Sequence, residues 1–520
     1  MRRSRRRARE PAARVDRPLR DGARRVVGCP SATARALQWR VAMNHATQQN
    51  LRSSDSFGGR RAVVIGGSLA GLVAARVLAD HFDEVIVIER DGIPDDLREP
   101  RKGVPQSRQL HGLLARGEKI LNDLFPGLTE DLVADGAVSF DVGLGLAWHH
   151  LGAWKLRCAT GVKNVCMTRP LLEAHVRRRT FALGRVRRMD QHDALELAAS
   201  PDRSRLTGVV IRRRDGQGEP ELLPADLVVD ASGRGSRTPA WLEALGYERP
   251  EESTIKVQVG YASRQYRPRD PSKFSWKGLY VLGSPSDSRR FGCIAPVEGG
   301  RWMVLLAGLF GDHAPADPDG FLEYARGLPN DTLYRALLAA EPETEVFTYK
   351  FPAHVRRHYE RMARLPEGLA VLGDAHASFN PVYGQGMTSA CLQAVTLGEA
   401  LVEQRRRAGQ GEIAGLTRRY QAVAAQVVEH PWQMSTGEDL AYPETEGQRP
   451  LLQPVMRWYT GMLHRAAQVD REVLVQFVRV MNLLDRPESL MAPGMFLRVL
   501  LAARTAASPA VSAAAPGYAG

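Results

Sequence analysis

The segment spanning residues 61–91 constrains the fold of this chain more than any other. An apolar run, RAVVIG, is followed by SLAGLVAARVLADHF, in which Leu69, Val73 and Val77 recur every four residues, and then by a second apolar run, DEVIVIERD. These patterns predict a buried strand, a helix with one apolar face and a second buried strand. A helix that joins two such strands makes them parallel, so the chain is expected to have an α/β fold.

The turn of this unit has the features of a dinucleotide-binding loop. Gly66 and Gly71 occupy the first and third glycine positions, and Ser68 stands where the second glycine belongs. The backbone N–H groups at the start of the helix are expected to face phosphate oxygens. Glu89, 18 residues after Gly71, is placed to accept hydrogen bonds from ribose hydroxyls. The alternative is an ordinary structural turn that contains glycine.

A second motif lies about 300 residues later, in GLAVLGDAHASFNPVYGQGM. An apolar strand ends near Asp374, and Gly384, Gly386 and Met387 begin a new helix. This segment resembles the GD motif and following helix of flavoprotein monooxygenases of the aromatic hydroxylase and squalene epoxidase type. In those families the aspartate binds the ribityl chain, and the helix N-terminus faces the flavin ring, where its dipole favours negative charge.

The resemblance extends from residue 60 to residue 498. RKGVPQSRQLHGLL, MTRPLLEAHVRRR and FNPVYGQGM look most like flavin-dependent epoxidases and hydroxylases of bacterial polyketide and terpenoid pathways, including polyether epoxidases. The resemblance implies that FAD is the cofactor. For Arg101, the alternative to a cofactor contact is that Arg101 and Lys102 form a solvated pair of charges. The expected cofactor-binding residues are Gly66, Ser68, Leu69, Ala70, Gly71, Glu89, Arg90, Arg98 or Arg101, Arg169, Asp374, Gly386 and Met387.

The implied reaction is insertion of one atom of O2 into an apolar polyketide- or terpenoid-like substrate, by epoxidation or hydroxylation, through a flavin C4a-hydroperoxide. Such an intermediate delivers electrophilic oxygen. The pocket therefore needs to position the substrate and exclude water more than it needs an acid or base side chain. No catalytic residue is assigned, and His111 and His376 are expected to be structural.

Two related activities remain as alternatives. Flavin-dependent halogenases carry Trp-x-Trp-x-Ile-Pro where this chain reads FGCIAP, and Lys102 is not evidently placed to relay a hypohalous species. A geranylgeranyl-type flavin reductase would need no O2. The electron donor is expected to be NAD(P)H. Both direct use and use through a flavin reductase stay open, because Asp230 is followed by Ser232 and Gly233 in place of the usual Asp-Gly pair.

The remaining segments suggest an inserted domain and a helical end. Residues 251–352 contain alternating apolar runs and a hairpin pattern that turns at Gly299 and Gly300, which is typical of an antiparallel sheet. We therefore expect a Rossmann-type FAD-binding domain with an inserted antiparallel-sheet substrate domain and C-terminal helices. The predicted segments are a basic arm (1–58), the FAD-binding domain (59–250 and 353–445), the β-rich substrate domain (251–352), a helical region (446–505) and a tail (506–520).

Periodic apolar residues support the C-terminal helices. One predicted face contains Leu452, Met456, Tyr459 and Leu463. A second is formed by Leu474, Val478 and Met481.

Charge and cysteine content further limit the class of protein that this chain can belong to. Residues 1–42 hold thirteen arginines against three acidic residues, so ten of the thirteen net positive charges lie there and the other residues carry only +3. Trp39 is the only aromatic residue among residues 1–42, so this arm is not expected to bind nucleic acid, and Met43 is a second plausible start. The five cysteines show no metal-ligand spacing, and no apolar run spans a membrane. A cytoplasmic enzyme of secondary metabolism, without a metal, is expected.

Overall fold

The computed structural model describes residues 56–93, 105–215 and 218–506. The basic arm, apart from its last residues, and the tail after residue 506 lie outside the described residues. Arg98, Arg101 and Lys102 also lie outside them, so their predicted roles stay predictions.

The predicted βαβ unit is confirmed. It consists of β1 (Gly59–Ile65), α2 (Leu69–Leu78) and β2 (Phe82–Glu89), and the two strands are parallel, with Val63 opposite Ile86. The helix ends four residues before Phe82, which the sequence analysis placed within it. Phe82 instead begins β2 and packs its ring 5.6 Å from that of Phe57.

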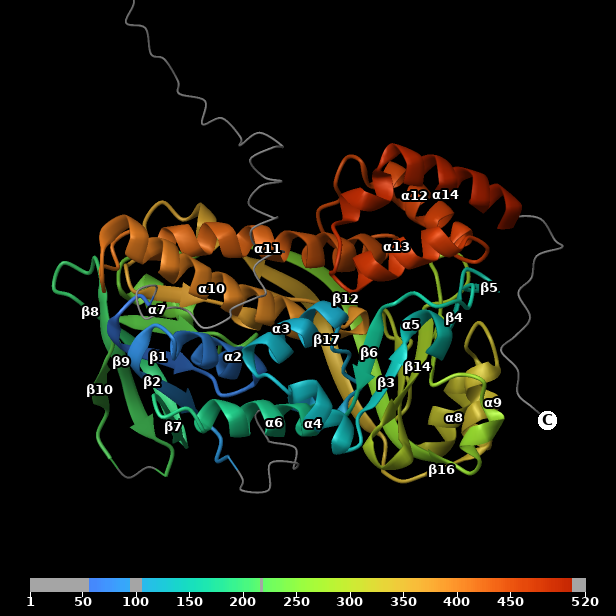
Figure 1. The fold of residues 1–520 in the computed structure, drawn as a ribbon, viewed down its shortest axis with the longest axis horizontal. Coiled ribbons are helices and arrows are strands. Elements are labelled where there is room, and N and C mark those ends of the chain that lie inside the picture. Colours follow the sequence, from blue (N-terminus) through green and yellow to red (C-terminus); the bar gives the residue numbers. More distant parts are fainter. Residues whose placement is uncertain (1–55, 94–104, 216–217, 507–520) are drawn as a thin grey trace, which may run out of the picture. The chain divides into compact units, whose positions relative to one another are not determined.

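A five-stranded parallel sheet, in the order β18-β11-β1-β2-β7, holds this unit. Val64 faces a core cluster formed with the covering helices α2, α6 and α10, whereas Val63 and Ile65 face a cluster shared with a smaller antiparallel sheet. The parallel sheet is therefore covered on both faces, as its continuous apolar strands require (Figure 1). The further elements of this half are β18 (Leu369–Val371), β11 (Leu227–Asp230), β7 (Val186–Asp190), β8 (His192–Ala199), β9 (Leu206–Arg213), β10 (Glu221–Pro224), α3 (Ala115–Leu124), α4 (Leu128–Ala134), α6 (Arg169–Phe181), α7 (Thr238–Ala244), α10 (Gly386–Ala408) and α11 (Leu416–Asp439).

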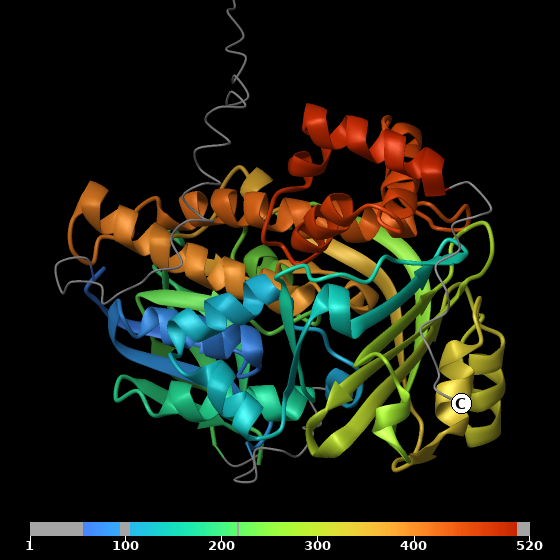
Figure 2. The ribbon, with the colours of Figure 1, turned by 45° about the vertical axis from the view of Figure 1, so that its right-hand side comes forward.

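The inserted sheet is larger than predicted. Its main path is β19-β17-β12-β15-β14-β13-β4-β5, with β16 paired to β12. Figure 2 shows the yellow-green strands of this sheet from the side. The hairpin turn is confirmed, since Gly299 and Gly300 both adopt left-handed backbone angles, with φ of 77° and 69°. Two strands that precede residue 251 also join this sheet, and β4 lies parallel to β13. The elements are β4 (Leu146–His150), β5 (Ala153–Trp154), β12 (Glu252–Pro268), β13 (Gly278–Leu282), β14 (Arg290–Val297), β15 (Arg301–Gly308), β16 (Ala340–Pro342), β17 (Phe347–Arg357), β19 (Ala377–Ser378), α8 (Pro318–Arg326) and α9 (Thr332–Leu338).

The C-terminal region is helical, as predicted, but one predicted apolar face is only half buried. Tyr459 and Leu463 are buried, whereas Leu452 and Met456 are 69% and 45% exposed. Packing begins at Tyr459, whose ring stacks on Phe496 with centroids 5.1 Å apart, so the first turn of the helix lies beyond the packed region. The helices are α12 (Gln453–Ala466), α13 (Arg471–Met481) and α14 (Pro493–Ala506).

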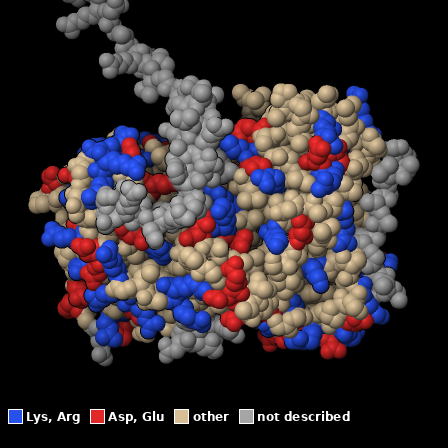
Figure 3. Space-filling model, viewed as in Figure 1, with Lys and Arg blue, Asp and Glu red and all other residues tan. Residues whose placement is uncertain are grey.

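The described surface carries charges of both signs. On the face shown in Figure 3, Lys and Arg side chains alternate with Asp and Glu. Within the described residues, no helix is both long enough and apolar enough to cross a membrane.

Candidate active site

The glycine turn between β1 and α2 is sterically fixed. Gly66 has a φ of 109°, and a Cβ atom placed on it would lie 2.6 Å from the carbonyl oxygen of Ala231. A Cβ on Gly71 would lie 1.7 Å from the carbonyl oxygen of Gly66, which no relaxation of a side chain could relieve. Both glycines therefore have the roles that the spacing predicted: a tight bend, and close packing of helix on strand.

Glu89 closes the same turn from the end of β2. Its Oε2 accepts a hydrogen bond from the Gly67 N–H at 2.9 Å, and its Oε1 accepts one from the Asp91 N–H at 3.0 Å. The carboxylate thus lies beside the glycine turn. Arg90 is exposed, and its carbonyl accepts a hydrogen bond from Arg214.

An ion cluster that the sequence analysis missed lies at the N-terminus of α2. Glu173 Oε1 accepts hydrogen bonds from the Ser68 hydroxyl at 2.6 Å, from the Leu69 N–H at 3.3 Å and from Arg169 Nε at 2.8 Å. Glu173 Oε2 accepts one from Arg177 at 3.1 Å. The i, i+4 spacing of Arg169, Glu173 and Arg177 on one helix was the available signal. Glu173 therefore fixes Arg169 beside the glycine turn.

Asp374 lies in the short helical turn η6 (Gly373–Ala375), directly after β18. Among the described residues, no group donates a hydrogen bond to its carboxylate. A Cβ on Gly386 would lie 3.9 Å from its Oδ1, so the start of α10 is close by. Burial raises the pKa of the Asp374 carboxyl, against the lowering effect of the neighbouring Arg234 and Arg169. The chain thus brings Arg169 and Asp374 together, and it leaves this carboxylate available to accept hydrogen bonds from hydroxyl groups.

The N-terminus of α10 faces the same region. The preceding turn, η7 (Pro381–Tyr383), ends at Gly384, which has a φ of 65°. No described side chain caps the helix, so the first N–H groups of α10 have no intrahelical partner and no side-chain partner among the described residues. The Met387 side chain is buried in the core, and only its backbone is placed for contact with a ligand.

A buried network anchors this turn, and the sequence analysis did not predict it. Asp439 at the end of α11 accepts hydrogen bonds from the Tyr383 hydroxyl at 2.7 Å and from Asn380 Nδ2 at 2.9 Å. His354 Nε2 lies 2.6 Å from Asp439 Oδ2, and both side chains are buried. Burial, followed by the charge of Asp439, raises the pKa of Tyr383, so its hydroxyl stays a donor. The network ties the α10 turn to β17 and α11.

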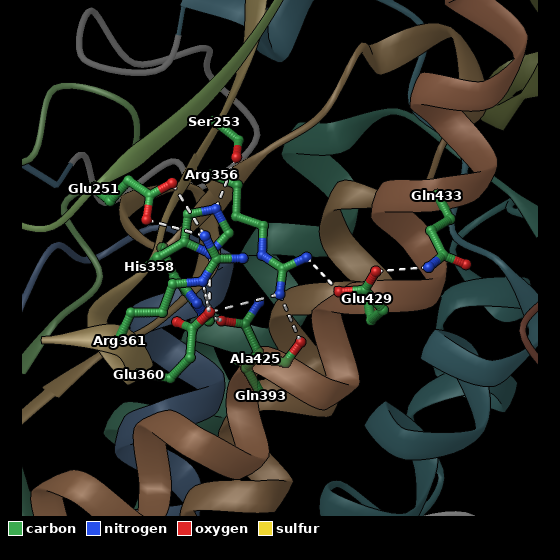
Figure 4. Close-up of polar contacts among 11 residues, drawn as sticks. Glu251, Ser253, Arg356, His358, Glu360, Arg361, Gln393, Ala425, Glu429 and Gln433 are labelled. Carbon is green, nitrogen blue, oxygen red and sulfur yellow. Dashed lines mark hydrogen bonds and ion pairs between the residues drawn. The ribbon is translucent and has the colours of Figure 1, made fainter. Parts of the chain in front are cut away.

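A second network joins β12, the end of β17 and α11 (Figure 4). Arg356 at the end of β17 pairs with Glu429 on α11 at 2.5 Å, and His358 contacts both Glu360 and Ser253, at 2.9 and 2.8 Å. These contacts fix β12 and β17 against α11. The candidate site lies beside these elements.

The two candidate histidines have environments that suit neutral side chains. Burial lowers the pKa of His111 to about 4 and that of His376 to about 4. His111 Nδ1 lies 2.9 Å from the Gln109 carbonyl, and His376 Nδ1 lies 3.0 Å from Gln393 Oε1. Both environments fit the predicted structural role.

Asp230 at the end of β11 is committed to its own loop. It is fully buried, and its two oxygens accept hydrogen bonds from Ser232, Ser236 and Thr238. This carboxylate shapes the loop after β11.

The chemistry of these groups fits FAD. The glycine turn at the start of α2 suits the pyrophosphate and Glu89 suits a ribose. The free Asp374 carboxylate suits the hydroxyls of a ribityl chain, and the uncapped N–H groups of α10 suit negative charge on a flavin ring. These groups come from two segments that are far apart in the chain and meet in the fold. One segment suits each half of a dinucleotide.

Comparison with known proteins identifies the family. The FAD binding domain family model matches residues 60–431. Protein Rv3254 of Mycobacterium tuberculosis is 36% identical over 442 residues, which cover 82% of this chain and 90% of that protein. Two solved structures share the fold: flavin-dependent brominase Bmp2 (TM-score 0.59, 15% identity, covering 85% of this chain and 98% of that one) and p-nitrophenol 4-monooxygenase PnpA from Pseudomonas putida DLL-E4 (TM-score 0.55, 15% identity, covering 82% and 99%). The chain belongs to the FAD binding domain family and is an FAD-dependent oxidoreductase.

Proposed function

We propose that this enzyme transfers one oxygen atom from O2 to an apolar, polyketide- or terpenoid-like substrate, by epoxidation or hydroxylation. The observation that carries the proposal is the apolar face of the inserted sheet beside the α10 turn. Val382 in that turn and Leu110 pack on a core cluster together with Tyr280 and Tyr349 of the sheet. An apolar substrate would bind there, next to the groups proposed to hold the flavin.

The proposed cofactor contacts follow from the geometry above. The turn from Gly66 to Gly71 and the α2 N-terminus would hold the pyrophosphate, with Arg169 fixed beside them by Glu173. Glu89 would accept hydrogen bonds from the adenosine ribose, and Asp374 would accept them from the ribityl hydroxyls. The first N–H groups of α10 would stabilise negative charge on the ring. FAD, once bound and reduced, supplies electrons and activated oxygen.

The protein's own contribution at the reacting end is orientation and exclusion of water. Tyr261 donates a hydrogen bond to Asn380, and burial raises the pKa of Tyr261 well above its ordinary value, so it remains a neutral donor. The apolar cluster around it leaves a dry surface in which electrophilic oxygen would be protected from water.

The proposed electron donor is NAD(P)H, acting directly or through a separate flavin reductase. Mixing the FAD-loaded protein with NADH or NADPH under nitrogen distinguishes the two. Bleaching of the flavin absorbance without an added protein indicates direct use, and bleaching only after a reductase is added indicates the indirect route.

The reaction is tested with chemically reduced, FAD-loaded protein and an apolar extract of the host cell. We expect new products that are heavier by one oxygen atom, formed in air and absent under strict anaerobiosis. Reduced products that form without O2 would instead indicate an ene reductase. Products that require halide and contain halogen would indicate a halogenase, the activity of the Bmp2 fold relative.

A further inference from the structure

A buried lysine lies at the far end of the apolar sheet face. Lys155 follows β5, is only 4% exposed, and donates one hydrogen bond from Nζ to the His464 carbonyl at 2.5 Å. Within the described residues, no carboxylate lies within ion-pair distance of it. An ammonium group in this position has lost water without gaining a directly paired counter-ion, since Glu438 acts on it only from beyond ion-pair distance, and this is costly unless an anion binds.

A second donor nearby also lacks an acceptor. The indole Nε1 of Trp148 is buried and, among the described residues, has no hydrogen-bond partner. Lys155 Nζ lies 6.0 Å from the centre of the Trp148 ring, and the Lys155 backbone N–H is bonded to the Trp148 carbonyl at 2.8 Å. Two buried donors with unfilled capacity therefore lie side by side, one on β4 and one directly after its partner strand β5.

The cluster is continuous with the proposed substrate face. The Trp148 ring contacts Tyr280 of β13, with centroids 6.0 Å apart. Tyr280 packs against the same core cluster as Val382 of the α10 turn. A substrate that lies along this face could reach from the flavin end to Lys155.

The surface near the cluster is also cationic. A groove of about 710 Å³ lies between α12 and the segment after α11, and Arg457 and Arg465 line it. Neither arginine makes an ion pair with a described residue. Such a groove attracts anions.

We propose that Lys155, with the Trp148 indole N–H, binds an oxyanion of the substrate, which is therefore an apolar molecule with one acidic group, a carboxylate or an ionised enol. This inference rests on the proposed function, because it assigns the cluster to the pocket of that enzyme. Lys155 would determine specificity by pairing with the acidic group and so placing the apolar part beside the α10 turn.

The test uses calorimetric binding of two matched probes, 2-naphthoate and the neutral 2-naphthamide, to the full-length, FAD-loaded protein. We expect at least about tenfold tighter binding of naphthoate, because a buried charged hydrogen bond adds that much affinity. Lys155→Met should remove this preference and leave naphthamide binding unchanged. Lys119→Met, which alters an exposed lysine paired with Asp123, should preserve it.

The pH dependence provides a second readout that needs no variant of Lys155. Burial lowers the pKa of Lys155 to about 7, so the naphthoate preference should fall as the pH rises from 6 to 9. Other groups that face the cluster are His149, His150, His464, Asp287 and Glu438.

The neighbouring groups can be separated from Lys155. Burial lowers the pKa of His150 to about 3 and that of His464 well below its ordinary value, so both stay neutral over this range, and burial also lowers the pKa of His149. Burial raises the pKa of Glu438 to about 7, so the same fall must persist in Glu438→Gln.

A wild-type protein without preference for naphthoate, or a preference that survives in Lys155→Met, overturns the inference. Loss of preference in Lys155→Met, together with a product that contains no oxygen from O2, would support the anion site and contradict the proposed monooxygenase reaction.

Discussion

At the scale of single residues, Asp374 offers the clearest test of the cofactor site. Its carboxylate accepts no hydrogen bond from a described residue, so its removal should cost little internal bonding. We expect Asp374→Ala to weaken FAD binding by about 1.5–3 kcal/mol, as loss of hydrogen bonds to a charged group does, measured by calorimetric titration of the FAD-free protein. Asp270→Ala, which removes the cap of an exposed turn, is the control and should bind FAD normally. Equal affinity of both variants would remove Asp374 from the site.

For Glu173, the prediction concerns the free energy of unfolding. Glu173→Ala would leave Arg169 and Arg177 buried without their shared carboxylate, and breaking such a pair typically costs about 3–5 kcal/mol. We expect a loss of that order in the free energy of unfolding of the FAD-free protein, measured with urea. Glu403→Ala breaks an i, i+4 pair with Arg407 at the surface and should cost less than about 1 kcal/mol. Similar losses in the two variants would contradict the buried role of Glu173.

The sequence identified those site residues whose role depends on their neighbours in the chain. Gly66 and Gly71 are defined by one turn, and their predicted roles match the geometry. Asp439 could not be found in this way, because its partners His354 and Asn380 lie 85 and 59 residues away and meet it only in the folded protein. No short motif encodes such a network.

At the scale of elements, the packing of α2 on β1 depends on Gly71. Gly71→Ala would place a Cβ against the Gly66 carbonyl, so α2 must shift away from the turn. We expect a lower melting temperature and loss of FAD binding, measured by thermal denaturation and flavin content. Gly461→Ala, in α12, places its Cβ in open space and should be neutral or stabilise by about 0.5–1 kcal/mol. Normal flavin content in Gly71→Ala would contradict the proposed role of the turn.

The predicted strands were confirmed where each strand pairs with its neighbour in the sequence. The hairpin of β14 and β15 follows from two glycines between apolar runs. The parallel pairing of β4 with β13 joins segments more than 100 residues apart, and alternation of side chains does not specify a distant partner. Similarly, periodicity predicted the helix that begins next to Leu452, but it could not show that no described element covers the first turn of this helix.

At the scale of the whole molecule, buried titratable groups make stability depend on pH. Burial lowers the pKa of seven of the described histidines, four of them to about 4 or about 3, and these four remain neutral in the folded protein while the unfolded chain takes up protons below about pH 6.5. Two glutamates act in the opposite direction, because burial raises each pKa to about 7 and both carry protons in the folded state. The four histidines are His81, His111 and His376, each with a pKa of about 4, and His150, with a pKa of about 3; the glutamates are Glu399 and Glu438.

The histidines outnumber the glutamates, so the free energy of unfolding should fall as the pH decreases from about 6.5 to about 4.5, by up to about 1.4 kcal/mol per pH unit for each uncompensated histidine. Urea denaturation at several pH values measures this. Glu399→Gln removes one opposing group and should make the fall steeper. Stability that stays constant or rises on acidification would contradict the assignment of neutral buried histidines.

The central claim, that this FAD-dependent oxidoreductase is a monooxygenase acting on an apolar acid, is tested most directly by isotope labelling. Reduced, FAD-loaded protein is supplied with farnesoic acid, or with its neutral counterpart farnesol, under oxygen-18 gas in ordinary water. We predict an epoxide or alcohol that contains one oxygen-18 atom, formed faster from the acid than from farnesol. A product whose new oxygen comes from water, or one that forms without O2, would contradict the claim.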